Sequence, residues 1–281
     1  MLYLLLGDPV EHSISPKLYK AAFGWTGLDH DYQARRAANA AEALGHLQDR
    51  QVAGASVTIP LKSALIESMD ELDPLVKLAG ALNTIVKRDG RLCGWNTDVA
   101  GLLAALGSYR EELAGRSAAV LGAGGAARAC LVSLDRLGLG RALVLARRDE
   151  AAAALCRDLG GRLSIELEPG RLGSQSAAQE LGRAALVCNC TPLGMWPLVD
   201  AAPIDPELIA PGAVVFDAVY RPRATRLLKL SRARGCRIVD GAAMFLHQAL
   251  QQFELLTGVK PPIERMSALV DRLLDENRDD R

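Results

Sequence analysis

The chain has 281 residues, 49% of them hydrophobic, so it is long enough for two domains, or one large domain, with a buried core. Its 33 Lys and Arg residues match its 33 Asp and Glu residues, which gives a formal net charge of 0 at pH 7. A chain without net charge has no overall field that attracts nucleic acid or an anionic membrane, and we expect neither as a partner.

Strand-like and helix-like segments alternate along the N-terminal part of the chain. The predicted strands are Leu2–Leu6, His30–Ala34, Gly54–Thr58, Thr84–Lys87 and Leu92–Gly94. The predicted helices are Pro16–Thr26, Ala40–Arg50, Lys62–Met69 and Val99–Leu106. This alternation is typical of α/β architecture with mainly parallel sheets.

The alternation continues after an apolar run that ends at Leu121. Further strands are predicted at Ala142–Ala146, Leu186–Asn189, Val214–Asp217 and Arg237–Val239, and the segment Gly160–Gly182 is predicted to be rich in loops. Apolar residues at helical spacing predict a helix over Gly241–Gly258. A second helix is predicted over Pro262–Asn277, with a polar tail at Asn277–Arg281.

The six cysteines are scattered, without a CxxC pair or a matching set of histidines. This usage favours reduced thiols over a disulfide framework or a zinc site, so we expect no metal site. The opening apolar run has no basic leader, and no segment approaches the roughly 20 apolar residues that span a bilayer. We therefore expect a cytoplasmic protein.

The most informative motif runs from Ala118 to Arg128, where an apolar run ends in a glycine turn and continues into a helix-prone segment. This is the context of a dinucleotide fingerprint: Gly122 allows the tight turn, Gly124 lets the backbone approach a pyrophosphate, and Ala127 allows close helix–strand packing. The alternative is a glycine-rich loop in an ordinary α/β domain. The next apolar run ends in Arg147-Arg148, and arginines there suit the 2′-phosphate of NADP.

Polar clusters occur at predicted strand ends and loops, where open α/β sheets bind ligands. Paired hydroxyls at Ser13 and Ser15 suit a carboxylate or hydroxyl ligand, although Ser15 followed by Pro16 also fits a helix N-cap with proline at the first helical position. Lys62 begins a predicted helix, where a cation opposes the helix dipole, so it is either functional or a solvated surface lysine. Asp98 precedes a predicted helix and could serve as its N-cap.

These clusters, taken in order, resemble the shikimate dehydrogenase family nearly from end to end. The matching segments are Gly7–Val10 with Ser13–Pro16, Ser56–Lys62, Ala79–Thr84, Asn96–Asp98, Gly122–Ala127, Asn189–Pro192 with Gly194-Met195, Asp217–Tyr220 and Gly241–Gln248. The resemblance implies the reversible, NADPH-dependent reduction of 3-dehydroshikimate to shikimate. It also implies a substrate-binding and catalytic domain of residues 1–100 plus 242–281, and a Rossmann-type NADP-binding domain of residues 101–241.

The resemblance also implies roles for individual residues. Lys62 and Asp98 would be the catalytic pair. The substrate would be bound by Ser13, Ser15, Thr58, Asn83, Asp98, Tyr220 and Gln248, although the local pattern by itself favours an exposed glutamine at 248. The cofactor would be bound by Gly122, Ala123, Gly124, Gly125, Ala126, Ala127, Arg147, Arg148, Ala218 and Gly241.

Two positions depart from the family pattern. Ser56 stands where the family usually has asparagine, so one substrate hydrogen bond is lost, bridged by water or redirected. The family's N-R-T cofactor signature reads Ala146-Arg147-Arg148 here, and the following Asp149 would repel a 2′-phosphate. NADP is therefore the predicted cofactor, with NAD or mixed use as the alternative.

Other functions stay open on the sequence. The chain could be a quinate/shikimate or aminoshikimate dehydrogenase, a folate-linked dehydrogenase, or a non-catalytic NADP-binding sensor. A folate-linked enzyme gives Ser13 and Ser15 no duty, and a sensor needs neither Lys62 nor Asp98. A monomer and a homodimer are both compatible with the apolar stripes of the predicted helices.

Overall fold

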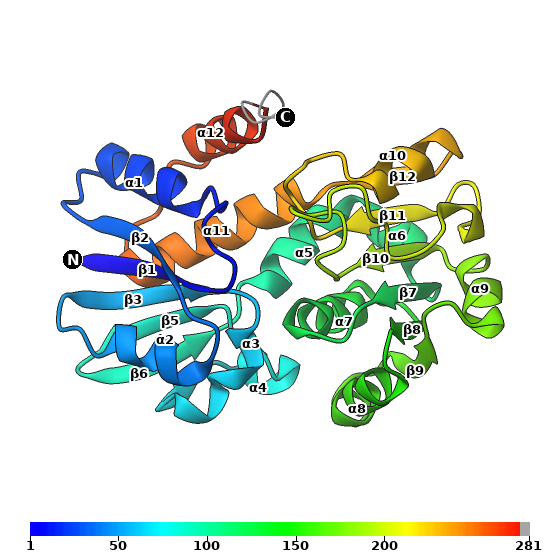
Figure 1. Cartoon of the computed structure of the whole chain (residues 1–281), viewed down its shortest axis with the longest axis horizontal. Helices are drawn as coiled ribbons and strands as arrows, with labels where there is room; N and C mark the ends of the chain where they lie inside the picture. Colours follow the sequence, from blue (N-terminus) through cyan, green and yellow to red (C-terminus); the bar gives the residue numbers. More distant parts are fainter. Residues whose placement is uncertain (276–281) are drawn as a thin grey trace. The chain divides into compact units, whose positions relative to one another are not determined.

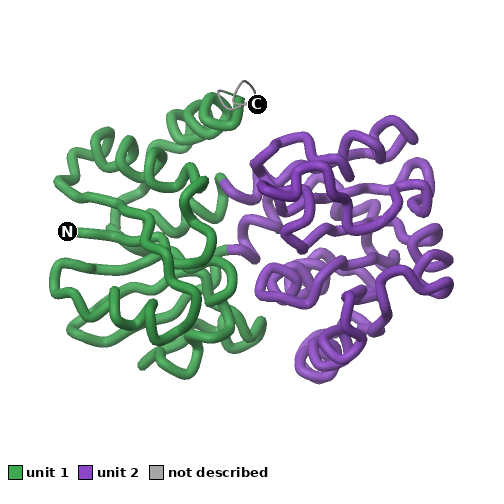
Figure 2. The backbone as a smooth tube through the Cα atoms, in the orientation of Figure 1, with its two compact units in different colours: residues 1–97, 246–281 green, residues 98–245 purple. Residues whose placement is uncertain are grey.

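The computed structural model describes residues 1–275, so the predicted tail Asn277–Arg281 lies outside the described residues. The chain divides into two compact units, Met1–Thr97 with Leu246–Arg281 and Asp98–Phe245 (Figure 2). Each unit has its own six-stranded sheet, and the predicted α/β class is confirmed.

The sheet of the first unit is mixed and has the strand order β2-β1-β3-β5-β6-β4. Its strands are β1 (Leu2–Gly7), β2 (Asp31–Arg36), β3 (Val52–Val57), β4 (Glu71–Leu72), β5 (Thr84–Arg88) and β6 (Arg91–Trp95). β1 pairs in parallel with β2 and β3, whereas β5 pairs antiparallel with β3 and β6. Asp89 and Gly90 join β5 to β6 with φ angles of 49° and 78°, the left-handed backbone that a two-residue hairpin turn requires.

Helices cover both faces of this sheet (Figure 1). They are α1 (Ser15–Thr26), α2 (Ala40–Leu47), α3 (Leu61–Ala64), α4 (Pro74–Ala79), the C-terminal part of α11 (Gly241–Thr257) and α12 (Ile263–Asp275). Leu4 and Leu6 of β1 belong to an aliphatic cluster with residues of α2, α3 and α4. On the opposite face aromatic rings of α1 and α11 meet, with the Phe23 and Phe253 centroids 5.5 Å apart.

The single helix predicted over Lys62–Met69 is wrong. The chain forms α3, ends it at Leu65, and continues as a 3₁₀ turn over Ile66–Ser68. The bonds from Ser68 N to Leu65 O (3.1 Å) and from Met69 N to Ile66 O (3.1 Å) span three residues and so tighten the last turn. Met69 is then extended and leads into β4, which pairs with β6.

The sheet of the second unit is entirely parallel, with the order β12-β11-β10-β7-β8-β9. Its strands are β7 (Ser117–Leu121), β8 (Arg141–Ala146), β9 (Glu166–Arg171), β10 (Leu186–Asn189), β11 (Val214–Asp217) and β12 (Arg237–Val239). Numbered within the unit, the order is 3-2-1-4-5-6 read from the β9 edge, which is the doubly wound Rossmann arrangement. The strand order reverses between β7 and β10, and ligands of such sheets bind at the carboxyl ends of these strands.

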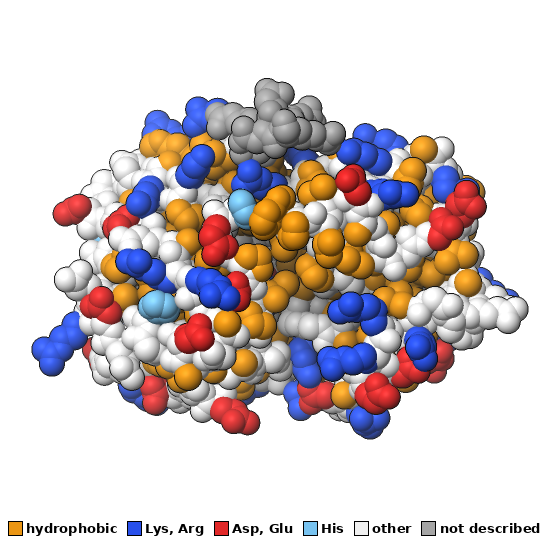
Figure 3. Space-filling view, in the orientation of Figure 1, with side chains coloured by type: hydrophobic (Ala, Val, Ile, Leu, Met, Phe, Trp, Pro, Cys, Tyr) orange, Lys and Arg blue, Asp and Glu red, His pale blue; other side chains and the backbone are white. Residues whose placement is uncertain are grey.

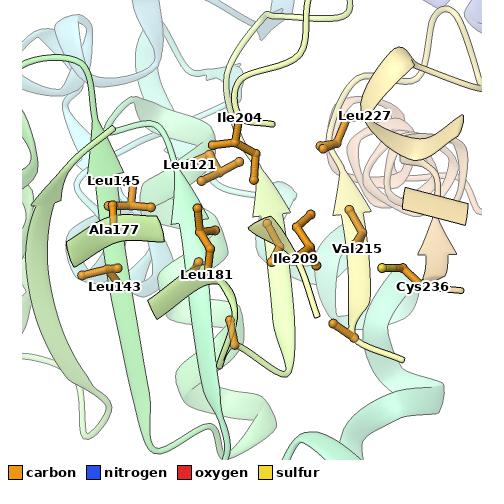
Figure 4. Close-up of a cluster of buried hydrophobic side chains, with 14 of the residues drawn as sticks. Leu121, Leu143, Leu145, Ala177, Leu181, Ile204, Ile209, Val215, Leu227 and Cys236 are labelled. Atoms are coloured by element: carbon orange, nitrogen blue, oxygen red, sulfur yellow. The ribbon is translucent and has the colours of Figure 1, made fainter. Parts of the chain in front are cut away.

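The helices of the second unit are α5 (Asp98–Leu106), α6 (Arg110–Leu113), α7 (Gly125–Leu137), α8 (Asp149–Gly160), α9 (Gln175–Leu181), α10 (Arg226–Ala233) and the start of α11, with 3₁₀ turns at Gly107–Tyr109 and Pro206–Leu208. One face of the sheet carries a buried cluster that includes Leu121, Leu145 and Val215, against which Leu181 of α9 packs (Figure 4). The strands are apolar because helices cover the parallel sheet on both faces.

The prediction of a loop-rich segment over Gly160–Gly182 is also wrong, because this segment holds β9 and α9. β9 includes Pro169 and Gly170, which a central strand would disfavour, but it lies at the edge of the sheet and pairs only with β8. α9 is short, and its N-cap is Ser174, whose hydroxyl accepts a hydrogen bond from Ala177 N (3.2 Å).

Acidic and basic side chains are both scattered over the face drawn in Figure 3, in keeping with their equal numbers. Within residues 1–275, no helix combines the length and the hydropathy that crossing a membrane requires. Among the same residues, no group of three or more His, Cys, Asp and Glu side chains could hold a metal ion.

Candidate active site

In the first unit, the loops that follow β1 and β3 are bonded to each other. Asp8 N donates to Ile59 O (2.7 Å) and Thr58 N donates to Leu6 O (2.9 Å). A Cβ atom at Gly7 would lie 2.3 Å from Thr58 Cγ2 and 2.7 Å from Ile59 O, so only glycine fits there. This close approach holds Thr58 next to the loop that begins at Gly7.

Ser13 and Ser15 lie together at the start of α1. The Ser13 hydroxyl donates to Ser15 Oγ at 3.1 Å and accepts from Ser15 N at 3.2 Å. The capping interpretation of Ser15 is wrong: Ile14 is the N-cap, its side chain makes no cap hydrogen bond, and Ser15 is the first helical residue. The Ser13 hydroxyl instead binds the first backbone N–H of α1, and the Ser15 hydroxyl is held by the Ser13 hydroxyl.

Lys62 is half-buried in the first turn of α3. Its carbonyl oxygen accepts a hydrogen bond from Leu82 N at 2.7 Å. The backbone that carries Lys62 is thereby fixed next to the backbone that carries Asn83.

Asn83 is hydrogen-bonded through both ends of its side-chain amide, and it is only 1% exposed. Its Oδ1 accepts from Thr97 N (2.8 Å) and from the Thr84 hydroxyl (3.0 Å), and its Nδ2 donates to Thr97 Oγ1 (2.9 Å). The Asn83 amide also donates to Gln248 Oε1 at 3.3 Å. The local prediction of an exposed Gln248 is therefore wrong, because this side chain is half-buried against Asn83.

Thr97 was not among the predicted site residues, although it holds Asn83 through both its main chain and its hydroxyl. The segment Asn96-Thr97-Asp98 was part of the family resemblance, but only Asp98 was assigned a role. Asp98 itself is 3% exposed and is the first residue of α5, so it lies within the helix rather than before it. Lys62 belongs to the first unit and Asp98 to the second.

In the second unit, the glycine turn lies at the carboxyl end of β7, next to the strand-order reversal. Gly122 has a φ of +113°, and a Cβ atom there would lie 3.1 Å from Cys190 O. Gly124 is the N-cap of α7, and no side chain caps this helix. A Cβ atom at Gly124 would meet nothing within 4 Å.

This turn fits a bound pyrophosphate. The amides of Gly125, Ala126 and Ala127 form the first turn of α7, where N–H groups lack intrahelical partners and the helix dipole favours negative charge. Open space over Gly124 leaves the backbone accessible. Ala123 is half-buried between the two glycines, and Ala127 is buried under the helix.

Arg147 and Arg148 are exposed directly after β8, where the second strand of this fold ends. Arg148 is the N-cap of α8, and the exposed Asp149 is its first residue. A third arginine, Arg171, ends the neighbouring strand β9 in register with Ala146. Sequence reasoning missed Arg171 because the segment around it was predicted to be loop.

The strand ends β11 and β12 bring Ala218 and Gly241 together. A Cβ atom at Gly241 would lie 2.8 Å from Ala218 O and 2.9 Å from Asp217 O, so the start of α11 needs glycine. Tyr220 is half-buried, and its ring packs on Phe245 with the centroids 4.4 Å apart.

Asp217 anchors the loop that carries Ala218 and Tyr220. Its Oδ1 accepts from Asn189 Nδ2 (2.9 Å) and Val219 N (3.0 Å), and its Oδ2 accepts from the Thr225 hydroxyl (2.7 Å). No cation is among these partners, and burial raises the pKa of the Asp217 carboxyl to about 6. Asp217 was not among the predicted site residues, and the signal that could have identified it is an acidic residue at the end of a buried strand.

The doubly wound parallel sheet and its uncapped glycine turn define the second unit as a Rossmann-type dinucleotide-binding fold. Residues 5–85 match the model of the shikimate dehydrogenase substrate-binding domain, and residues 241–270 match that of the shikimate 5′-dehydrogenase C-terminal domain. The chain is 40% identical over 277 residues to the shikimate dehydrogenase (NADP⁺) of Moorella thermoacetica, with 98% of this chain and 92% of the relative covered. The chain belongs to the shikimate dehydrogenase family.

Solved structures agree with this assignment. The shikimate 5-dehydrogenase of Thermus thermophilus, determined in complex with NADP(H) and shikimate, has a TM-score of 0.83 and 33% identity, covering 98% of this chain and 100% of that one. The quinate dehydrogenase of Corynebacterium glutamicum in complex with NAD has the same TM-score of 0.83 at 28% identity, covering 95% and 97% of the two chains.

Proposed function

We propose that this protein is an enzyme that catalyses the reversible, NADPH-dependent reduction of 3-dehydroshikimate to shikimate, a step of aromatic amino-acid biosynthesis. The observation that carries the proposal is the hydrogen-bonded cluster of Asn83, Thr97 and Gln248, next to the backbone of Lys62, in a chain that belongs to the shikimate dehydrogenase family. Relatives with the printed activity are similar over nearly the whole chain.

The first unit would bind the substrate. The Ser13 and Ser15 hydroxyls, 3.1 Å apart, suit the two oxygens of the substrate carboxylate. The ring hydroxyls would be bound by Thr58, Asn83, Asp98, Tyr220 and Gln248. Amides and hydroxyls of this kind discriminate strongly against ligands that lack the matching hydroxyl, because the buried polar groups would be left unpaired.

The second unit would bind NADP. The pyrophosphate would lie on the turn from Gly122 to Ala127, and Arg147 and Arg148, joined by Arg171, would contact the 2′-phosphate. Ala218 and Gly241 would lie beside the nicotinamide, which supplies the hydride to the substrate carbonyl when the cofactor is bound. Exposed Asp149 opposes the 2′-phosphate, so NAD stays the alternative cofactor, as in the quinate dehydrogenase noted above.

Lys62 and Asp98 would be the catalytic pair. The Lys62 ammonium would donate a proton to the carbonyl oxygen as it becomes a hydroxyl, which is general acid catalysis. Asp98 would orient the ammonium and favour its charged form. The two residues belong to different units, so their action on one substrate molecule is itself a prediction of this proposal.

A cytoplasmic location fits the free thiols of all six cysteines, five of which are buried. Size-exclusion chromatography with light scattering would decide between a monomer and a homodimer.

The deciding experiment is a spectrophotometric assay of the purified protein with shikimate and quinate, each with NADP⁺ and NAD⁺. We expect the highest kcat/KM with shikimate and NADP⁺. Faster oxidation of quinate with NAD⁺ would favour the quinate alternative, and binding of NADP⁺ without turnover of either acid would favour a sensor.

A further inference from the structure

Ser56 faces a closed polar network in the first unit. It is 4% exposed, accepts a hydrogen bond from the Tyr32 hydroxyl (2.7 Å), and donates to Gln252 Oε1 (2.8 Å). Gln252 is 3% exposed, and the same Oε1 accepts from the Tyr19 hydroxyl at 2.8 Å. The hydrogen bond expected to be lost or redirected at position 56 is thus redirected into the core.

The remaining end of the Gln252 amide points to the predicted substrate site. Gln252 Nε2 donates to the carbonyl oxygen of Asn83 at 2.8 Å. Since two hydroxyls bind the amide oxygen and a carbonyl binds the amide nitrogen, a flipped amide would set two carbonyl oxygens against each other. The orientation of Gln252 is therefore fixed by its partners.

Asn83 is held from two sides as a result. Its carbonyl oxygen accepts from both Val57 N (2.7 Å) and Gln252 Nε2 (2.8 Å), which ties it to β3 and to α11. Its side chain donates to Gln248, which lies one helical turn before Gln252 on α11. Gln252 thus fixes the position of Asn83 next to β3 and the position of the helix that carries Gln248.

We propose that Gln252 is a positioning residue that sets the geometry of Asn83 and Gln248, and through them the affinity for the substrate hydroxyls; this rests on the proposed function. In this chain the amide that supports the site belongs to Gln252 of α11. It reaches β3 through Ser56, whose side chain is shorter than the asparagine usual in the family. Gln252 is buried, its amide is bonded to three groups, and the residues that it positions lie between it and the predicted substrate.

The test compares Gln252→Met with Gln251→Met. Methionine keeps the length and apolar volume of the side chain but removes the amide. Gln251 is the matched control, since it is half-buried on the same helix and its Oε1 has no hydrogen-bond partner within the described part of the chain. We expect Gln252→Met to raise the KM for shikimate by about 5- to 20-fold, with kcat and the KM for NADP⁺ within about 2-fold of wild type.

A structural defect alone would lower the active fraction, and kcat would fall while KM stayed constant. That result, or equal KM values in the two variants, overturns the proposal. If Gln252→Met does not fold, Ser56→Ala removes one hydroxyl bound to Gln252 and should raise the same KM by about 2- to 5-fold. An unchanged KM in Ser56→Ala then overturns it.

Hydrogen exchange in the ligand-free protein separates this proposal from the proposed function. The amide of Val57 shares its acceptor with Gln252, so exchange at Val57 and over residues 81–84 should quicken in Gln252→Met and not in Gln251→Met. Absence of shikimate oxidation in wild type would defeat the proposed function, whereas unchanged exchange would defeat the positioning role.

Discussion

Lys62 is the residue whose replacement tests the chemistry most directly. Lys62→Ala should lower kcat by about 10²- to 10⁴-fold, the usual loss for a general acid–base group, with little change in the KM for NADP⁺. Steady-state kinetics of shikimate oxidation measure both. Lys77→Ala, which removes an exposed lysine from α4, is the control for loss of surface charge. Turnover that survives intact in Lys62→Ala would remove this residue from the mechanism.

Arg147 is expected to distinguish the two nicotinamide cofactors. Arg147→Ala should weaken the binding of NADPH by roughly 1.5–3 kcal/mol, the range for one hydrogen bond to a charged group. NADH should be almost unaffected because it has no 2′-phosphate. Titration of each coenzyme by fluorescence gives both constants, and equal losses would show that Arg147 does not contact the 2′-phosphate.

Asp217 should make the protein less stable as the pH rises. Burial raises its pKa from 3.8 to about 6, so between these values the folded state binds more protons than the unfolded state. The free energy of unfolding therefore falls as the pH rises through this window. Asp217→Asn cannot titrate there, and its stability relative to wild type should increase by about 2.5 kcal/mol between pH 4 and pH 7. Urea unfolding at several pH values measures this; a difference independent of pH would contradict it.

At the scale of elements, the turn between β7 and α7 contains one glycine that stability requires and another that cofactor binding is expected to require. Gly122→Ala places a Cβ on a backbone with φ +113° and 3.1 Å from Cys190 O, and should cost roughly 1–3 kcal/mol of stability. Gly124→Ala meets no protein atom within 4 Å and should leave Tm nearly unchanged, while its methyl group obstructs the pyrophosphate and raises the KM for NADP⁺. Thermal unfolding and kinetics of both variants check this; equal losses of Tm would be inconsistent with it.

The elements that sequence reasoning located best are those marked by short continuous apolar runs. The buried strands Leu186–Asn189 and Val214–Asp217 were predicted with the bounds that the structure has. β9 and α9 were missed because an edge strand tolerates Pro169 and Gly170, and a short helix shows little periodicity. Their conformation depends on pairing with β8 and on packing, which local sequence does not encode.

The same limit applied to the candidate site. Ser13 was a candidate because no local structural duty accounted for it, whereas Asn83 was assigned a role only through the family resemblance. Gln248 was assigned to the site only through the family resemblance, and Gln252 was not predicted, since a glutamine on a helix is ordinarily exposed. Their burial follows from the packing of α11 against residues far away in sequence.

At the scale of the whole molecule, the first unit is discontinuous in sequence. Deleting residues 246–281 removes Phe253 and Gln252 from its aromatic face, while the second unit, residues 98–245, stays complete. The truncated protein should bind NADPH within about 3-fold of wild type and lose measurable shikimate binding, because the sheet of the first unit has lost α12 and most of α11. Coenzyme fluorescence and calorimetry measure the two affinities, and retained shikimate binding would contradict the expectation.

The α11 helix begins in one unit and ends in the other, and this has a consequence for biosynthesis. As the chain leaves the ribosome, residues 98–245 emerge whole before the last segment of the earlier unit has been translated. The second unit can therefore reach its native state first, while residues 1–97 keep an uncovered aromatic surface until their remaining helices are synthesised. Nascent-chain arrest at successive lengths would reveal this inverted order of maturation.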